Sequence, residues 1–258
     1  MNCKNILFLV VITWVILPAS GCSTDSGTGA IRGELQQISV HDVDFNDPSG
    51  LTLDVSGEFL WCVSSERGDH IYRLSFEGES LAVLPYEGDD MEGITMNPND
   101  KTLWIAEERL RQVIQLDTLG NILQIVDVPV EKINENDGLE GISVNPENNH
   151  LFVLNEKNPR AFIELNEQMD MVRYEEIDFD PPFVMTDLSG LFYDHSNREF
   201  WMVSDESKKI VITDFELNPK KYFLLDREKF EGIAVDFSSN RLYLVNDEEN
   251  KLFVYEIL

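Results

Sequence analysis

The sequence predicts an all-β fold, a five-bladed β-propeller, from three observations. A Gly followed by Leu or Ile recurs at five positions that are separated by steps of 43, 48, 49 and 42 residues. Each copy carries Asp or Asn four residues after the Gly and an aromatic residue eleven after it. The glycines are Gly50, Gly93, Gly141, Gly190 and Gly232; the aromatics are Trp61, Trp104, Phe152, Trp201 and Tyr243. A repeat of this length is typical of propeller blades.

The second copy shows how one unit is built. Short apolar or alternating segments, separated by turn residues, predict four strands over residues 93–97, 102–106, 112–117 and 122–128. Asn97 favours an Asx-turn, because its side chain can accept a hydrogen bond from the backbone two residues on. Trp104 is expected to pack between neighbouring blades.

The two ends of the repeat region predict how the ring closes. The fifth copy ends with a strand over 251–257 and has no fourth strand after it, whereas residues 35–43 form a spare strand before the first copy. Pairing these segments in one blade would close the ring and remove two exposed edges. We therefore expect one domain over residues 35–258, most simply a monomer.

Residues 1–21 are typical of a signal peptide, with Lys4 followed by the apolar run Ile6–Leu17. Small residues lead to Cys22, so we expect lipidation of Cys22 and a flexible tether over residues 22–34. The alternative is an ordinary cleaved signal peptide. The expected location is the bacterial cell envelope, with the protein anchored to a membrane; the sequence leaves the membrane and leaflet open.

The amino-acid composition limits the classes of partner that the protein is expected to bind. The chain has 48 acidic and 20 basic residues, a net charge of −28, which disfavours nucleic acid and anionic lipid surfaces. The charge is compatible with cation binding, and the alternative is a solvated acidic surface. Cys62 is expected to be a buried apolar residue. No His has zinc-ligand spacing, and no Gly-x-Ser-x-Gly motif occurs.

Two sets of polar residues are predicted to meet at one end of the channel. The residue before each repeat Gly begins the innermost strand: Ser49, Glu92, Glu140, Ser189 and Glu231. A second acidic set follows the second strand of each blade, at 64–66, 107–109, 155–157, 204–206 and 246–248, and includes Asp205 and Asp247. In an antiparallel blade the first strand starts where the second ends. Carboxylates that converge repel one another, and Ca²⁺, with 6–8 oxygen ligands, resolves the conflict. Asp90, Asp137 and Asp187 are further possible ligands, and a hydrated acidic rim is the alternative.

The copies Glu92-Gly93-Ile94, Glu140-Gly141-Ile142 and Glu231-Gly232-Ile233, each leading into an aromatic second strand, resemble the SdiA-regulated family of exported β-propellers over about residues 36–258. NHL-repeat and gluconolactonase-like propellers share the pattern. The resemblance implies a membrane-associated propeller with no settled activity, linked to calcium in some members. The gluconolactonase-like enzymes bind a divalent metal through the position before this Gly, which maps onto Glu92, Glu140 and Glu231, with Ser49 and Ser189 as non-carboxylate members.

Three functions stay open at this point. The first is a calcium-responsive binding or sensing module without enzyme activity. The second is a metal-dependent hydrolase of the lactonase type, with Asp205 or Asp247 as base. The third is a scaffold for an unidentified envelope protein, with an incidental acidic rim.

Overall fold

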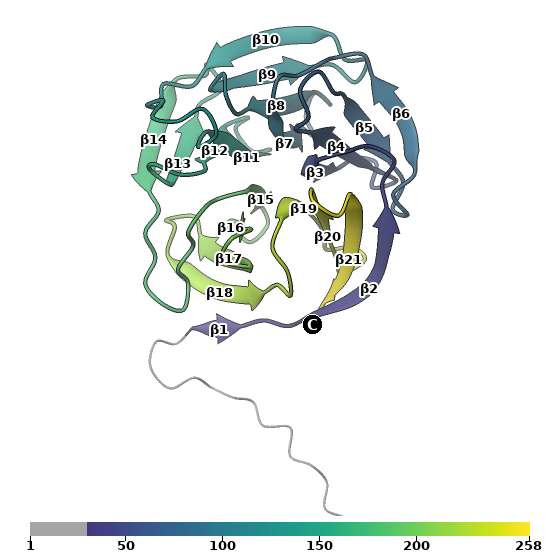
Figure 1. Ribbon diagram of the computed structural model, residues 1–258. Coiled ribbons are helices and arrows are strands. Elements are labelled where there is room, and N and C mark those ends of the chain that lie inside the picture. Colours follow the sequence, from purple (N-terminus) through teal and green to yellow (C-terminus); the bar gives the residue numbers. More distant parts are fainter. Residues whose placement is uncertain (1–29) are drawn as a thin grey trace, which may run out of the picture.

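Five small antiparallel sheets stand around a central axis in the computed structural model (Figure 1), which describes residues 30–258. The predicted five-bladed propeller is confirmed. The predicted signal peptide and Cys22 lie outside the described residues. Within those residues no helix is long and apolar enough to cross a membrane.

The first three blades each use four consecutive strands. Blade 1 contains β3 (Pro48–Leu53), β4 (Leu60–Ser64), β5 (Ile71–Leu74) and β6 (Ser80–Leu84). Blade 2 contains β7 (Met91–Met96), β8 (Leu103–Glu107), β9 (Gln112–Leu116) and β10 (Ile122–Asp127). Blade 3 contains β11 (Leu139–Val144), β12 (Leu151–Asn155), β13 (Ala161–Leu165) and β14 (Met171–Glu176). The first strand of each blade is innermost and the fourth is outermost (Figure 1).

Blades 4 and 5 hold both ends of the described chain. Blade 4 contains β15 (Gly190–Asp194), β16 (Glu199–Ser204), β17 (Lys209–Asp214) and β18 (Pro219–Leu224). Blade 5 contains β19 (Phe230–Asp236), β20 (Arg241–Asn246) and β21 (Lys251–Ile257), with β2 (Leu35–Asp42) as its outer strand. The β2–β21 register runs from Leu35 opposite Ile257 to Asp42 opposite Lys251. Closure through the two terminal strands is therefore confirmed.

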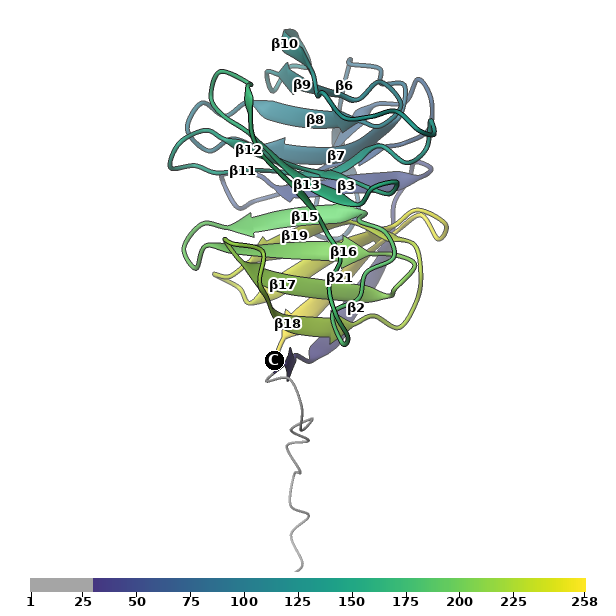
Figure 2. The same cartoon turned by 90° about the vertical axis from the view of Figure 1, so that its left-hand side faces the viewer.

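A short strand that the sequence did not indicate lies on the edge of blade 4. Residues 31–32 form β1 (Ile31–Arg32), which pairs in parallel with β18. The backbone N–H of Gly33 donates to Tyr222 O at 2.8 Å and continues this pairing. Figure 1 shows β1 along the outer edge of blade 4, and the side view in Figure 2 shows β18 and the C-terminus at this same outer edge of the ring. These residues fall inside the segment expected to be a tether, and the extra strand covers part of an edge that would otherwise be unpaired.

The hydrophobic core is divided into five clusters, each between two neighbouring blades. All five repeat aromatics are buried, and each packs against the next blade: Trp61 lies with Ile94 and Met96 of blade 2, for example, and Tyr243 with Leu51 of blade 1. The predicted packing between blades is confirmed. Burying such aromatics at every junction holds the ring together without helices.

The other two repeat positions also have clear roles. All five Asx-turns form, each with a carboxylate or amide oxygen accepting from the backbone N–H two residues on, at 2.8–3.0 Å. The repeat glycines allow the innermost strands to approach closely around the axis. A Cβ on Gly93 would lie 2.1 Å from the carbonyl oxygen of Glu140. Any side chain there would force neighbouring blades apart.

Candidate metal centre

An acidic cavity of about 460 Å³ opens at one end of the channel. Its lining contains eleven carboxylates and four basic side chains. The lining carboxylates are Asp47, Glu66, Asp90, Glu92, Glu108, Glu140, Glu156, Asp205, Glu206, Glu231 and Asp247. The acids gather at this end because the strands are antiparallel: Met91 pairs with Glu107, so the start of β7 lies beside the end of β8. The two predicted acidic sets therefore do share one rim.

The three glutamates that precede repeat glycines all line this cavity. Glu140 is 7% exposed, and Glu92 and Glu231 are partly exposed. Burial first, and repulsion from neighbouring carboxylates second, raises the pKa of Glu140 and of Glu231 well above its ordinary range. The pKa of Glu92 is raised in the same way, although a hydrogen bond from Ser49 opposes the shift. Without a cation, burial and mutual repulsion favour the protonated form of these groups.

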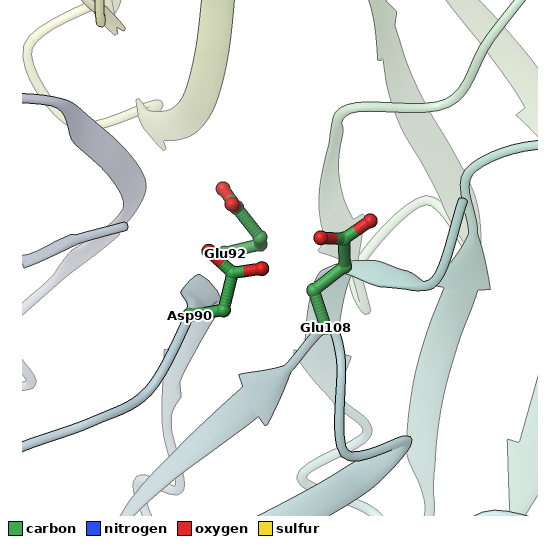
Figure 3. A group of neighbouring side chains, drawn as sticks. All are labelled: Asp90, Glu92 and Glu108. Carbon is green, nitrogen blue, oxygen red and sulfur yellow. The ribbon is translucent and has the colours of Figure 1, made fainter. Parts of the chain in front are cut away.

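Blades 2 and 3 bring carboxylates closest together. One group consists of Asp90, Glu92 and Glu108 (Figure 3), and a second of Glu108, Glu140 and Glu156. Within each group, one oxygen per residue lies within 4.8 Å of the others. Glu108 belongs to both groups and is 4% exposed. Burial, then hydrogen bonding with Asp90, raises the pKa of Glu108 to about 8, although Gly138 N–H donates to its Oε1 at 2.9 Å.

Two buried carboxylate oxygens of this region have no hydrogen-bond partner, Asp90 Oδ2 and Glu140 Oε2, and of these only Asp90 Oδ2 has an ion-pair partner, Arg109. Glu140 Oε2 is buried and accepts from no donor among the described residues. A buried carboxylate oxygen without a partner costs free energy, so such atoms are rare unless they serve a ligand. Glu107, which is also buried, gives the contrast: it accepts from the backbone N–H groups of Asp89 and Asp90 and from Tyr86 Oη.

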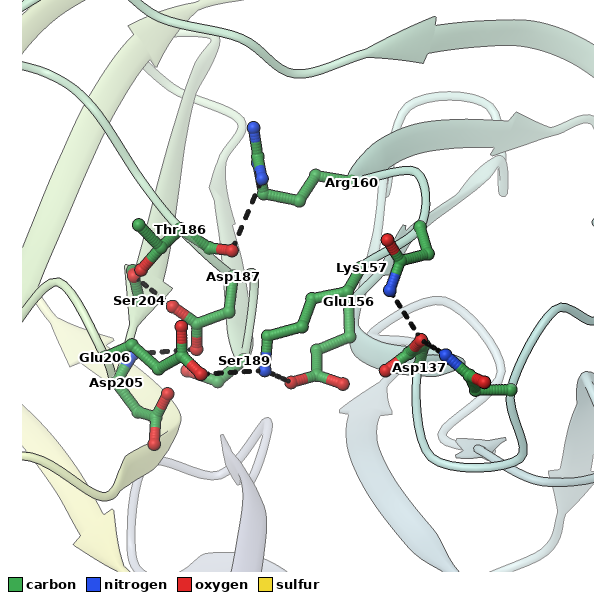
Figure 4. A network of polar contacts seen from close by, with 12 residues as sticks. Asp137, Glu156, Lys157, Arg160, Thr186, Asp187, Ser189, Ser204, Asp205 and Glu206 are labelled. Atoms are coloured by element: carbon green, nitrogen blue, oxygen red, sulfur yellow. Dashed lines mark hydrogen bonds and ion pairs between the residues drawn. The ribbon is translucent and has the colours of Figure 1, made fainter.

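Two basic side chains balance the flanking acids of blades 2 and 3. Arg109 Nε lies 3.0 Å from Asp90 Oδ2, and Lys157 Nζ lies 2.6 Å from Glu156 Oε1 and 3.1 Å from Glu206 Oε1 (Figure 4). No ion pair of the described residues involves Glu92, Glu108 or Glu140. These three carboxylates have no ion-pair partner among the described residues, and neither do Glu231 and Asp247 on the other side of the cavity.

Blades 4 and 5 contribute a different arrangement. Asp187 accepts from Ser204 Oγ and, at 3.2 Å, from the backbone N–H of Asp205 (Figure 4). Lys229 Nζ lies 3.1 Å from Asp205 Oδ2. Burial alone would raise the pKa of Asp205, but hydrogen bonds from Asp187 and Lys229 and the charge of Lys229 hold it below the ordinary value. Burial raises the pKa of Asp247, against the effect of Lys229.

The two predicted serines face the neighbouring blade. Ser49 Oγ donates to Glu92 Oε2 at 2.6 Å, with the carbonyl oxygen of Glu92 at 2.9 Å, and Ser189 Oγ donates to the carbonyl oxygen of Phe230 at 3.0 Å. Both hydroxyls thus join blades, and neither residue is part of the cavity lining. Asp137, named as a further candidate, is held by the side-chain amides of Asn134 and Asn158, which lower its pKa.

Residues that follow the second strand were only partly identified from the sequence. Asp205 and Asp247 were named as ligands, yet Glu108 and Glu156 occupy the equivalent position, fifteen residues after the repeat Gly. The full set is Ser65, Glu108, Glu156, Asp205 and Asp247, and all five line the cavity. The fixed offset would have found them, had it been applied to every copy.

Comparisons with solved structures show which proteins have a similar architecture. The most similar solved structures include a glutaminyl cyclase from Myxococcus xanthus, with a TM-score of 0.68, 12% identity and coverage of 89% of this chain and 99% of that one. A structure of a nidogen/laminin complex matches with a TM-score of 0.58 and 13% identity, over 81% of this chain and 75% of that one. A streptogramin B lyase matches with a TM-score of 0.50 and 17% identity, over 82% of this chain and 65% of that one. These likenesses are in fold alone.

A search of curated proteins found no match. The family model described as SdiA-regulated matches residues 28–257, which include every blade. This chain therefore belongs to the SdiA-regulated family of β-propellers.

Proposed function

We propose that this protein binds Ca²⁺ at the mouth of its channel, chiefly through Glu92, Glu108 and Glu140. One observation carries the proposal: Glu140 Oε2 is buried without a hydrogen-bond partner, in a residue whose carboxylate lies within 4.8 Å of those of Glu108 and Glu156. A cation would give that oxygen a partner and would offset the repulsion between neighbouring carboxylates, which together with burial raises the pKa of Glu140.

The chemistry of the lining supports a hard cation. Among the described residues, the cavity is lined by carboxylates, one hydroxyl, one amide and four basic side chains, without His or Cys. Oxygen-only donor sets suit Ca²⁺ and Mg²⁺, whereas zinc sites use His and Cys. Ca²⁺ accepts 6–8 oxygens in flexible geometry, which suits carboxylates contributed by separate blades better than the strict octahedron of Mg²⁺ does. Of the other predicted ligands, Glu231, Asp205 and Asp247 line the same cavity from blades 4 and 5, whereas Ser49 and Ser189 lie outside its lining.

The wider role is a calcium-responsive binding module in the cell envelope, held at a membrane through lipid on Cys22. Family membership and the acidic cavity support the first part of this role, and the sequence of residues 1–22 supports the second. In this role ion binding would change the charge that the rim presents to a partner, because each Ca²⁺ offsets two carboxylates.

Calorimetric titration of Ca²⁺ into the chelator-treated protein tests the proposal. We expect a saturable heat for the wild type, at least a tenfold weaker affinity for Glu140→Gln, and no heat for the triple variant Glu92→Gln/Glu108→Gln/Glu140→Gln. Glu58→Gln, at an exposed residue outside the cavity lining, is the matched control and should titrate like the wild type. Equal heats for the wild type and the triple variant would end the proposal.

A hydrolase function would require Asp205 or Asp247 to act as a general base. A general base needs a free carboxylate with a pKa near the working pH. Asp205 is instead paired with Lys229, and its pKa is lowered. Asp205 therefore does not suit the role of base, which would fall to Asp247, whose pKa is raised by burial. Because we propose binding without turnover, we expect a panel of lactones to show no turnover that depends on Ca²⁺ or Zn²⁺. Metal-dependent turnover would restore the hydrolase.

A further inference from the structure

A groove of about 690 Å³ is formed by blades 1 and 2 at the end of the channel away from the acidic cavity. Strands β3 and β4 show the placement, because Pro48 pairs with Ser64 at the acidic end and Leu53 pairs with Leu60 beside the turn that reaches this groove. No residue lines both the groove and the acidic cavity. More than half of the groove lining is apolar: Val55, Phe59, Trp61, Met96, Pro98 and Leu119. Sites for small organic molecules combine such a lining with a few polar groups.

The guanidinium of Arg73, a residue of the groove lining, has no partner among the described residues. It forms no ion pair or hydrogen bond with them, and its Nε is buried. Its central carbon lies 4.7 Å from the centroid of the Phe59 ring, which supports it. Two other buried arginine nitrogens of the described chain, Arg111 Nε and Arg241 Nη1, also lack a hydrogen bond. However, Arg111 donates to carbonyl oxygens through its other nitrogens, and Arg241 forms an ion pair with Glu256. A buried donor without an acceptor costs free energy, and a ligand in the groove would supply the acceptor.

The repeat does not require an arginine at this position. Arg73 lies opposite the repeat aromatic Trp61 in the β4–β5 pairing. The residues opposite the other four repeat aromatics are Gln115, Glu164, Ile212 and Val254. None of these is basic, so a blade can pack its aromatic residue without a positive charge beside it. Arg73 is therefore a feature of this groove and not of the blade.

Lys101 adds a second positive charge to the groove, and its ammonium also has no ion pair or hydrogen bond within the described chain. The one carboxylate of the lining is Asp54, and both of its oxygens are engaged. They accept from the backbone N–H of Ser56 at 2.8 Å and from Trp61 Nε1 at 3.0 Å. Exposed charges elsewhere on this acidic chain are screened beyond about 8 Å at physiological ionic strength. The groove is therefore complementary to a ligand that carries a single negative charge.

We propose that this groove binds a small organic carboxylate with an apolar body. The carboxylate would accept hydrogen bonds from the Arg73 guanidinium, whose planar fork matches its geometry, and Lys101 would add charge. The body would lie against Met96, Pro98 and Leu119. The inference goes beyond the proposed calcium binding and does not depend on it, because the two sites share no lining residue.

Calorimetric titration of cinnamate into the protein in chelator tests the proposal. We expect saturable binding by the wild type and at least tenfold weaker binding by Arg73→Met, because the charged hydrogen-bond donor is lost. Arg198→Met is the matched control: the Arg198 guanidinium also lies over a ring, 4.3 Å from the centroid of Phe215, and has no ion pair among the described residues, but it does not line the groove. It should bind cinnamate like the wild type.

Two further ligands and a second variant keep the inference testable if Arg73→Met does not fold. Cinnamamide has the same body without the charge, and acetate has the charge without the body, so each should bind the wild type at least tenfold more weakly than cinnamate does. Lys101→Gln, at an exposed residue, should weaken cinnamate binding about threefold. The inference is overturned if the wild type shows no saturable binding of cinnamate at millimolar concentrations, if cinnamamide binds as well as cinnamate, or if folded Arg73→Met keeps the wild-type affinity. None of these results bears on Ca²⁺ binding at the other end of the channel.

Discussion

Replacing Glu108 by Gln is expected to stabilise the metal-free protein at alkaline pH. The buried carboxyl of Glu108 has a pKa of about 8, against 4.5 ordinarily. Between these values the folded protein binds more protons than the unfolded chain, so its stability falls as the pH rises through this window. Each pH unit of difference corresponds to about 1.4 kcal/mol, which gives a ceiling of about 5 kcal/mol lost above pH 8.

The measured gain should be smaller than this ceiling. The cavity is open to solvent, which screens the carboxylates, so we expect Glu108→Gln to gain about 2–3 kcal/mol at pH 8.5. For a domain of this size that corresponds to about 5–10 °C in Tm. Gln keeps an oxygen that can accept from Gly138 N–H, and its amide can donate to Asp90. Below pH 4.5 the two proteins should melt together.

Calcium should reverse the order. At one thousand times Kd, Ca²⁺ stabilises the wild type by about 4.1 kcal/mol, which exceeds the expected advantage of Glu108→Gln in chelator, and it should stabilise Glu108→Gln much less. Thermal unfolding followed by circular dichroism, with chelator and with Ca²⁺, at pH 4.5 and pH 8.5, gives all the values needed. The control Glu58→Gln should follow the wild type throughout. The reasoning is refuted if Glu108→Gln melts at or below the wild-type temperature at pH 8.5 in chelator.

Three further outcomes test the fold. Gly93→Ala should lower the free energy of unfolding by about 3 kcal/mol or more in denaturant, because its Cβ would lie 2.1 Å from Glu140 O. Gly57→Ala, which has open space around it but a φ of 70°, should lower it by about 1 kcal/mol. Equal losses for the two variants would contradict the close approach at the axis. Deleting residues 1–42 should abolish cooperative unfolding by removing β2, while deleting residues 1–29 should leave the Tm within a few degrees; a stable protein without β2 would contradict closure. Cys62, fully buried with its thiol pKa raised by burial, should react with a thiol reagent only in denaturant, and rapid labelling of the native protein would show that blade 1 opens.

The sequence predicted much of the fold because the chain repeats one unit five times. Each copy has the same Gly, Asx-turn and aromatic offsets, so one interpretation of residues 93–128 applied to the whole ring. The strand β1 escaped prediction, because two residues of a polar segment carry no periodicity and its pairing depends on the position of β18.

The sequence predicted where the candidate site lies, but it predicted less well which residues form it. Glu92, Glu140 and Glu231 line the cavity because the position before each Gly begins an inner strand, which follows from the repeat itself. Glu108, by contrast, became prominent only from its distances to Asp90, Glu92, Glu140 and Glu156.

The sequence by itself determined the architecture and the end of the channel where the acids gather, because both follow from a periodic pattern read along the chain. Only the tertiary structure decided which carboxylates are paired, with Lys229 on Asp205, Lys157 on Glu156 and Arg109 on Asp90, and which stand alone, as Glu140 does. Charge pairing depends on distances between side chains of different blades, and those distances are set by how the blades pack around the axis.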